Sequence, residues 1–330
     1  MLNMESPYPL LALLISVAVT ALSLPLAAKL SHRLGLLGAD FHKEDRPKIP
    51  KLGGVGIFLG VLAGATVGLY AGGFWNTAVA FGLAISIAAA IGLVEDFREI
   101  NPIVKPVLIA LAGLPILLLT SYSPYPELPF IGRARLTIVY PILILVGVTI
   151  VANAVNSTDV LNGSMALTSL ASLTPLIIIS LIKMNMEAII IGLTLVGVLT
   201  VFLSQNYYPA KIFSGNAGSL TVGVSIAVLA IVGRLEIPAL IALMPQIMNE
   251  FHIIFSLGGL RNAKRVPTRP VELNAGMIRA SRSSNAPITL VRLLTASEPL
   301  TEKGVVHRMA LLTSYSALLS MITYLLFMRG

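Results

Sequence analysis

Long apolar segments recur along nearly the whole of this 330-residue chain and leave few charged residues between them. Only 12% of the residues are charged, whereas soluble domains average about 25%. A bilayer core about 30 Å thick requires roughly 20 predominantly apolar residues for each spanning helix. The sequence therefore predicts an all-α integral membrane protein that forms a single polytopic domain over residues 1–330.

Ten apolar segments are predicted to be transmembrane helices. The first is expected to remain as a span, because Glu5 stands where a cleavable signal would carry basic residues. The predicted ranges are 9–28, 53–72, 77–94, 103–121, 137–157, 165–182, 187–204, 217–233, 236–257 and 308–328.

Positive charge divides unevenly between the two sides that ten spans would create. One side would carry 18 of the 23 Lys and Arg residues. The positive-inside rule makes this side cytoplasmic and places the N-terminus and C-terminus outside. The segment 258–308 lies on the cytoplasmic side and is long enough to form a small loop subdomain before the last helix.

The most unusual polar residues lie between two apolar runs, where Asn153, Asn156, Asp159 and Asn162 recur every three residues. On a helix they form a drifting row down one side. Polar groups in a bilayer usually face a bundle interior or a water-filled cavity. Hydrogen bonding between helices is the alternative, and it explains one or two Asn better than three Asn with an Asp.

Two glycine-rich turns precede predicted helices on the same side. Glycine permits close backbone approach, and a helix N-terminus offers free N–H groups to an anion. The alternatives are a basic loop at lipid headgroups and glycines that serve helix packing. The candidate binding residues are Lys48, Gly53 and Gly54 in the first turn, and Lys211, Gly215 and Asn216 in the second.

An acidic pair, Glu95 and Asp96, ends one predicted helix, and Lys105 opens the next. Adjacent helix positions point to different sides, so the two carboxylates are expected to have different partners. A solvated turn at the membrane interface is the alternative for this segment.

The last long loop is rich in arginine, whose planar fork suits phosphate recognition. Arg269 lies in the sequence VPTRP, where two prolines restrict its direction. Headgroup binding is the alternative for the other basic residues of this loop, Arg261, Lys264, Arg265, Arg279, Arg282 and Arg292. Together, the cytoplasmic segments offer the groups that would bind a nucleotide diphosphate with a divalent metal at a membrane surface.

In order and spacing, these segments resemble the polyprenyl-phosphate N-acetylhexosamine-1-phosphate transferases over about residues 29–325. The resemblance rests on an acidic pair with Lys105 nine residues after its second acid, on the NxxNxxDxxNG pattern that ends at Gly163, and on IFSGNAGS. It implies transfer of a sugar phosphate from a UDP-sugar to a membrane isoprenoid phosphate, with release of UMP. VPTRP loosely echoes an element of the dolichol branch.

The branch within this family can be narrowed. Bacterial cell-wall members carry clustered histidines in the last loop, where this chain has only His307. The resemblance therefore implies an archaeal member that uses dolichyl phosphate and UDP-GlcNAc in the first membrane step of N-glycan or surface-glycan assembly. It places the active site at the cytoplasmic face of the cell membrane.

The resemblance also implies Mg²⁺, with Mn²⁺ as a substitute, and a role for each candidate residue. At Asn216 the family usually has an Asp that binds the metal, so either Asp159 supplies the missing charge or metal binding is weak. The implied catalytic residues are Asp96, Asp159 and Lys105, and the implied metal ligands are Asn162, Asn216 and Asp159. The implied substrate-binding residues are Glu95, Asn153, Asn156, Lys48, Gly53, Gly54, Lys211, Gly215 and Arg269.

Other functions stay open on the sequence. A transporter of nucleotide-sugars or anions would place its polar groups near the midplane, often in repeated halves, and here they gather at one face. A lipid-phosphate-binding homologue without catalysis finds support in Asn216. The expected partners are the UDP-sugar, the prenyl phosphate and the bilayer, with no nucleic acid; a homodimer stays open.

Overall fold

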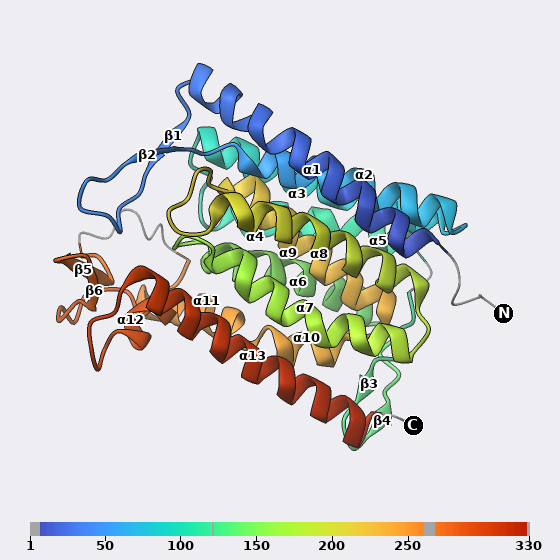
Figure 1. The fold of residues 1–330 in the computed structure, drawn as a ribbon. Coiled ribbons are helices and arrows are strands. Elements are labelled where there is room, and N and C mark those ends of the chain that lie inside the picture. Colours follow the sequence, from blue (N-terminus) through green and yellow to red (C-terminus); the bar gives the residue numbers. More distant parts are fainter. Residues whose placement is uncertain (1–6, 121, 261–267, 329–330) are drawn as a thin grey trace.

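The computed structural model describes residues 7–120, 122–260 and 268–328 as a bundle of helices with short β-hairpins at its ends (Figure 1). The helices are α1 Tyr8–Arg33, α2 Gly53–Ala71, α3 Trp75–Phe97, α4 Val104–Ala110, η1 Leu111–Gly113, α5 Leu114–Leu119, α6 Tyr140–Ser157, α7 Ser164–Ile182, α8 Met186–Asn206, α9 Gly215–Gly233, α10 Glu236–Ala242, α11 Met244–Ser256, α12 Leu290–Leu294 and α13 Glu302–Phe327. Three antiparallel pairs of strands are β1 Leu37–Ala39 with β2 Lys48–Pro50, β3 Glu127–Leu128 with β4 Gly132–Arg133, and β5 Val271–Asn274 with β6 Met277–Ala280.

The described helices are those of a multi-pass membrane protein. By length and composition, eight of them could cross a membrane, or nine if the bent pair α10 and α11 is one span. The least enclosed spans, α1 and α13, lie at opposite edges of the bundle (Figure 1). Exposed leucines along both helices, such as Leu22 and Leu326, suit contact with lipid.

The expected count of ten spans is not reproduced. The segment predicted at 103–121 forms α4, η1 and α5, which together have fewer than 18 apolar residues. The segment predicted at 236–257 bends by 68° between α10 and α11. Pro245 lies in the first turn of α11 and has no N–H to continue a straight helix from α10. The last helix begins at Glu302 and not at 308.

Helix α9 lies at the centre of the bundle and is the most enclosed span. It packs against α2, α3, α6 and α8. Small residues permit this close packing, because a Cβ on Gly54, Gly92 or Gly223 would overlap backbone atoms of the neighbouring helix. The close contacts bring the N-terminus of α9 next to the ends of α3 and α6, where the predicted polar residues lie.

The turns that carry those residues share one end of the bundle with β1–β2, β5–β6 and α12 (Figure 1). The start of α1, the end of α13 and the hairpin β3–β4 lie at the opposite end. A small apolar cluster attaches β6 and α12 to α13 and includes Ile278, Val291, Val306 and, from the turn after α6, Leu161. The described part of the last loop is therefore packed against the bundle.

Candidate active site

The N-terminus of α9 is capped by a carboxylate from another helix. Asp96 Oδ1 accepts hydrogen bonds from the main-chain N and the side-chain Nδ2 of Asn216, at 2.9 and 3.0 Å. Asp96 Oδ2 accepts one from the N of Ala217 at 3.2 Å. Free N–H groups and the helix dipole favour a negative charge at this position.

A chain of hydrogen bonds continues from this cap to Asn156 and Lys105. Asn156 Nδ2 donates to Asn216 Oδ1 at 3.0 Å and to Ser219 Oγ at 2.7 Å. Lys105 Nζ donates to Asn156 Oδ1 at 3.1 Å and forms an ion pair with Glu95 Oε2 at 2.8 Å. Glu95 and Asp96 thus have different partners, as their adjacent helix positions predict.

Asp159 lies in the turn between α6 and α7, and its Oδ2 accepts a hydrogen bond from Ser214 Oγ. The pKa of Asp159 is raised to about 6, chiefly by burial; the Ser214 hydrogen bond lowers it in part, and the nearby charge of Asp96 adds to the rise. A carboxylate that is costly to ionise in this position would be stabilised by a cation.

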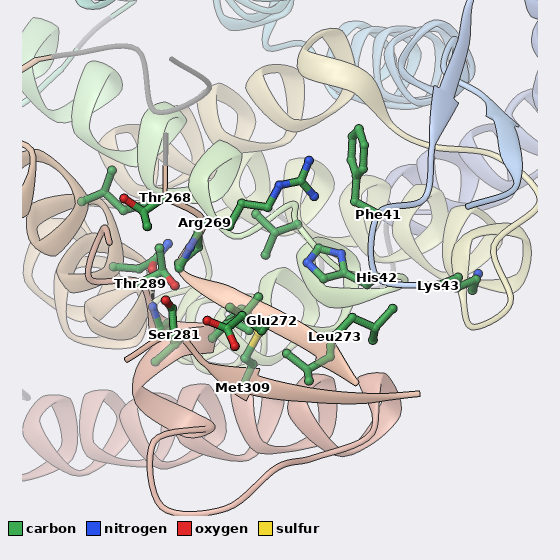
Figure 2. A pocket seen from close by; sticks show the side chains of 18 of the residues that line it. Phe41, His42, Lys43, Thr268, Arg269, Glu272, Leu273, Ser281, Thr289 and Met309 are labelled. Carbon is green, nitrogen blue, oxygen red and sulfur yellow. Dashed lines mark hydrogen bonds between the residues drawn. The ribbon is translucent and has the colours of Figure 1, made fainter. Parts of the chain in front are cut away.

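These groups line one cavity of about 700 Å³. The polar lining residues are Asp40, His42, Lys51, Asp96, Asn156, Asp159, Asn162, Asn206, Ser214, Asn216, Thr268 and Arg269. A second cavity of about 870 Å³ shares its wall with the first at Phe41, His42 and Arg269. Figure 2 shows these three residues on the wall of the second cavity. The guanidinium of Arg269 lies 4.5 Å from the centre of the Phe41 ring, which is a favourable cation–π distance.

The structure brings most of the predicted residues together. Asp96, Asn156, Asp159, Asn162, Gly215, Asn216 and Arg269 line the first cavity, and Glu95 and Lys105 contact it through Asn156.

Five predicted binding residues lie elsewhere. Lys48 and Lys211 are exposed at the surface, and Asn153 donates to Thr149 O within its own helix. Gly53 and Gly54 lie against the backbone of Phe213 and Gly218, so packing of α2 on α9 accounts for their lack of a side chain. Arg261, Lys264 and Arg265 lie outside the described residues.

Asn162 occupies a junction between four segments. Its Nδ2 donates to Asp40 Oδ2 at 3.0 Å and to Glu302 Oε1 at 2.6 Å. Its Oδ1 accepts from Lys43 Nζ at 3.3 Å and from the N of Ala210 at 2.6 Å. The carbonyl oxygen to which the family resemblance gives a metal-binding role thus accepts from an ammonium and a main-chain N–H.

Several residues of the site were not among the predicted ones. Asp40 and His42 belong to a loop in which the sequence singles out lysines and glycines. Burial raises the pKa of Asp40, but hydrogen bonds from Lys43 and Asn162 and the charge of Lys43 outweigh it, so the pKa lies below its usual value. Burial lowers the pKa of His42, and Arg269 and Lys43 lower it further against the effect of Asp40. The short sequence DFHK, which brings an acid, a histidine and a lysine together, is the feature of the sequence that could have indicated these residues.

The donor set of the cavity has the chemistry that Mg²⁺ prefers. Within the described ranges, no group of three or more His, Asp or Glu side chains is arranged to hold a metal ion. The cavity does offer the carboxylates of Asp96 and Asp159 and the amide oxygen of Asn216, whereas the amide oxygen of Asn156 accepts from the Lys105 ammonium. Because Mg²⁺ is commonly held by one or two carboxylates together with substrate phosphates, these residues fit a site that the substrate would complete.

Comparison with known proteins places the chain among membrane glycosyltransferases. The sequence profile of glycosyl transferase family 4 matches residues 78–234. A protein of Sulfolobus acidocaldarius that carries the name UDP-N-acetylglucosamine–dolichyl-phosphate N-acetylglucosaminephosphotransferase is 30% identical over 248 residues, which cover 73% of this chain and 76% of the relative. The protein of the same name in Saccharolobus solfataricus is 30% identical over 244 residues, with the same shares covered. A Bacillus subtilis protein named undecaprenyl-phosphate N-acetylglucosaminyl 1-phosphate transferase is 29% identical over 262 residues, which cover 74% of this chain and 70% of the relative.

Proposed function

The chain belongs to glycosyl transferase family 4, and from this premise we propose that it transfers N-acetylglucosamine 1-phosphate from UDP-GlcNAc to dolichyl phosphate and releases UMP. The names of the relatives support the donor, the acceptor and the reaction. The observation that carries the proposal is the cavity at the N-terminus of α9, where three carboxylates, four amides and an arginine meet.

The reaction requires two anions to approach each other. An oxygen of the acceptor phosphate attacks the β-phosphorus of the UDP-sugar, the bond to the α-phosphate oxygen breaks, and UMP leaves. Two unit charges 4 Å apart repel by roughly 4 kcal/mol at an effective dielectric constant of 20. Positioning and charge compensation are therefore the main tasks of the protein.

We propose that the negative charges are offset from two sides of the cavity, by a metal held near α9 and by Arg269 of the last loop. A bound Mg²⁺ would neutralise pyrophosphate charge, and Asp159 and Asn216 are the residues that would hold it, with Mn²⁺ as a substitute. Arg269 would bind a phosphate oxygen from the side of the last loop. Lys105 would act through Asn156, because its ammonium already pairs with Glu95. Asp96 would hold the N-terminus of α9 in register and orient the acceptor phosphate.

We propose that Asn162 is not a metal ligand and that it instead holds together the segments of Asp40, Lys43, Ala210 and Glu302. Its carbonyl oxygen lies 3.3 Å from the Lys43 ammonium, and a divalent cation at the same oxygen would be repelled. Asp159 is thus the carboxylate left to offset the missing charge at Asn216.

We also propose that the cavity faces the cytoplasm of the cell membrane, with both termini outside and α4–η1–α5 completing a tenth crossing. Because the chain contains no cysteine, a single introduced cysteine would be the sole thiol. Lys211→Cys should react with a membrane-impermeant thiol reagent only in inside-out vesicles, and Arg135→Cys only in right-side-out vesicles. The reverse pattern would contradict the orientation.

The function is tested by UMP release from UDP-GlcNAc by purified protein with dolichyl phosphate and Mg²⁺. Release should require both the lipid and the metal, and should fall in Asp159→Asn. Since one phosphoanhydride is exchanged for another, UMP and the lipid product should regenerate UDP-GlcNAc. No release with any UDP-HexNAc or prenyl phosphate, from well-folded protein, would favour lipid binding or transport without catalysis.

A further inference from the structure

We propose that Glu302 is a positioning residue for the transfer reaction: its carboxylate holds the turn 158–163 through Asn162 and thereby keeps Asp159 at the cavity. The inference rests on the proposed function. Glu302 begins α13, far along the chain from the other site residues, and no polar pattern in the sequence singles it out.

The contact between Glu302 and the turn is double and buried. Glu302 Oε1 accepts hydrogen bonds from the main-chain N of Asn162 at 2.8 Å and from its Nδ2 at 2.6 Å. The side chains of Glu302 and Asn162 belong to residues that are 4% and 3% exposed. One carboxylate oxygen thus fixes both the backbone and the side chain of the same residue.

Burial of this carboxylate is costly and incompletely compensated. Glu302 Oε2 is buried and has no hydrogen-bond partner among the described residues. The neighbouring Asp40 carries the same charge and bonds the same Asn162 amide, while Lys43 is the cation of the cluster and pairs with Asp40 at 2.7 Å. A buried charge in such an arrangement weakens the fold unless it is well paired. This cost is consistent with a functional requirement on the position of the turn.

The turn that Glu302 holds has other attachments as well. Asp159 accepts from Ser214 Oγ, Asn162 Oδ1 accepts from Lys43 Nζ and Ala210 N, and Leu161 packs in the apolar cluster beside α13. Ser164 Oγ bonds Thr158 O at 2.6 Å and Leu161 O at 2.8 Å, within the segment itself. Gly163 N donates to Asn206 Oδ1 at 2.9 Å from the side of α8. Glu302 and Asp40 both bond to the amide of Asn162. Glu302 alone also bonds to the main chain of Asn162, three residues after Asp159, so loss of Glu302 would loosen the turn at that point.

Glu302 is itself held at a defined position. The Thr301 side chain caps α13 by accepting from the N of Gly304 at 3.2 Å. The preceding residue, Leu300, exchanges two main-chain hydrogen bonds with Ile278 of β6. The start of α13 is therefore fixed both by its own cap and by the hairpin β5–β6. Because Glu302 lies at this start, its hydrogen bonds to Asn162 hold the turn at a defined distance from α13.

The test compares Glu302→Ala and Glu302→Gln with Glu298→Ala, a matched control. Glu298 lies in the same segment, but its carboxylate is exposed and pairs with Arg308 at the surface. Two quantities are measured on full-length protein: kcat and KM for UMP release, and amide hydrogen exchange of the segment 158–163 in the absence of substrate.

Glu302→Ala should speed exchange at 158–163 and lower kcat on the order of 10- to 100-fold, the usual range for a residue that orients a metal ligand. KM should change little, because the loss concerns the position of Asp159 at the reacting atoms. Glu302→Gln should recover most of kcat, since its amide oxygen can accept the same two hydrogen bonds. Glu298→Ala should behave as wild type.

Unchanged exchange and kcat in Glu302→Ala would overturn the inference. So would a Glu302→Gln variant that is as slow as Glu302→Ala with normal exchange, because the charge and not the position would then matter. If Glu302→Ala does not fold, Glu302→Asp replaces it, and wild-type exchange and kcat in that shortened variant would overturn the inference. If the wild type releases no UMP, the proposed function fails, and the exchange measurement still decides whether Glu302 holds the turn.

Discussion

Asn216 donates both its main-chain N–H and its side-chain amide to Asp96, at 2.9 and 3.0 Å. An aspartate at position 216, which the resemblance gives as usual for the family, would have no side-chain N–H to offer. Without a cation, two carboxylates would then face each other at the N-terminus of α9. Asn216 makes this contact favourable in the absence of metal, and in the proposed site Asp159 would supply the metal-binding charge.

Replacing Asn216 by Asp should make the stability of the protein depend on divalent metal. Without Mg²⁺ we expect the free energy of unfolding to fall by about 1–3 kcal/mol, because a charged hydrogen bond is lost and like charges approach. Added Mg²⁺ should restore it by binding the folded state. Thermal unfolding of purified protein with EDTA or Mg²⁺ measures both effects. Asn153→Asp, outside the cavity, is the control and should show no recovery; equal stability of Asn216→Asp and wild type in EDTA would refute the prediction.

Asp159 should make metal-free protein less stable as the pH rises. Its folded-state pKa of about 6 exceeds the ordinary value of 3.8, so ionisation costs stability progressively between about pH 4 and pH 6 and fully above that range. Asp159→Asn lacks this cost and should be the more stable protein at pH 7.5, by at most about 3 kcal/mol because the side chain is only partly shielded. The difference should vanish near pH 3.5. Unfolding midpoints at both pH values test this, and identical midpoints at pH 7.5 would argue against it.

Lys105 should matter for both stability and catalysis, but through different partners. The side chains of Lys105 and Glu95 are 14% and 16% exposed, so Lys105→Met leaves a largely buried carboxylate without its cation, at a cost of about 3 kcal/mol. The double variant Lys105→Met with Glu95→Gln should recover the stability but not the UMP release, because Asn156 still lacks its donor. Recovery of both properties would show that Lys105 serves only the ion pair.

Gly54 should be intolerant of any side chain. A Cβ at this position would overlap the main-chain N of Gly218, so Gly54→Ala must separate α2 from α9 and should lower the thermal midpoint and the UMP release together. Gly147→Ala is the matched control, since no atom lies within 4 Å of its Cβ position, and alanine favours the helix by roughly 1 kcal/mol. A Gly54→Ala protein with wild-type stability would show that the helices can repack without cost.

Much of the fold could be predicted because bilayer crossing leaves a direct pattern in the sequence. Eight long apolar helices and the bent pair lie where apolar runs predict them. The sequence did not predict the break in the helix at 104–119 or the 68° bend after α10. An apolar run indicates that a segment is buried in lipid, but it does not indicate whether the helix formed there is straight. The three hairpins were also missed, since strands of two to four residues are too short to show alternation.

The candidate site was likewise predicted only in part. Polar groups at the helix ends of an apolar chain are costly and usually mark a functional site. This predicted four residues that do line one cavity: Asp96, Asn156, Asp159 and Asn216. Gly53, Gly54, Lys48 and Lys211 were chosen by residue type and by their place before a predicted helix. Neither feature separates a glycine that packs from one that binds, or an exposed lysine from a buried one.

By itself, the sequence determined that the chain is a multi-pass membrane protein and which helix ends carry its carboxylates and amides, because hydropathy and local spacing depend on neighbouring residues. Only the tertiary structure decided which partner each polar group takes. It joined Asp96 to Asn216 across 120 residues and Asn162 to Glu302 across 140. The first pairing follows from how small residues let α9 approach α2, α3 and α6, and the second from the packing of α13 on α7. Contacts between helices so far apart along the chain leave no periodic pattern in the sequence.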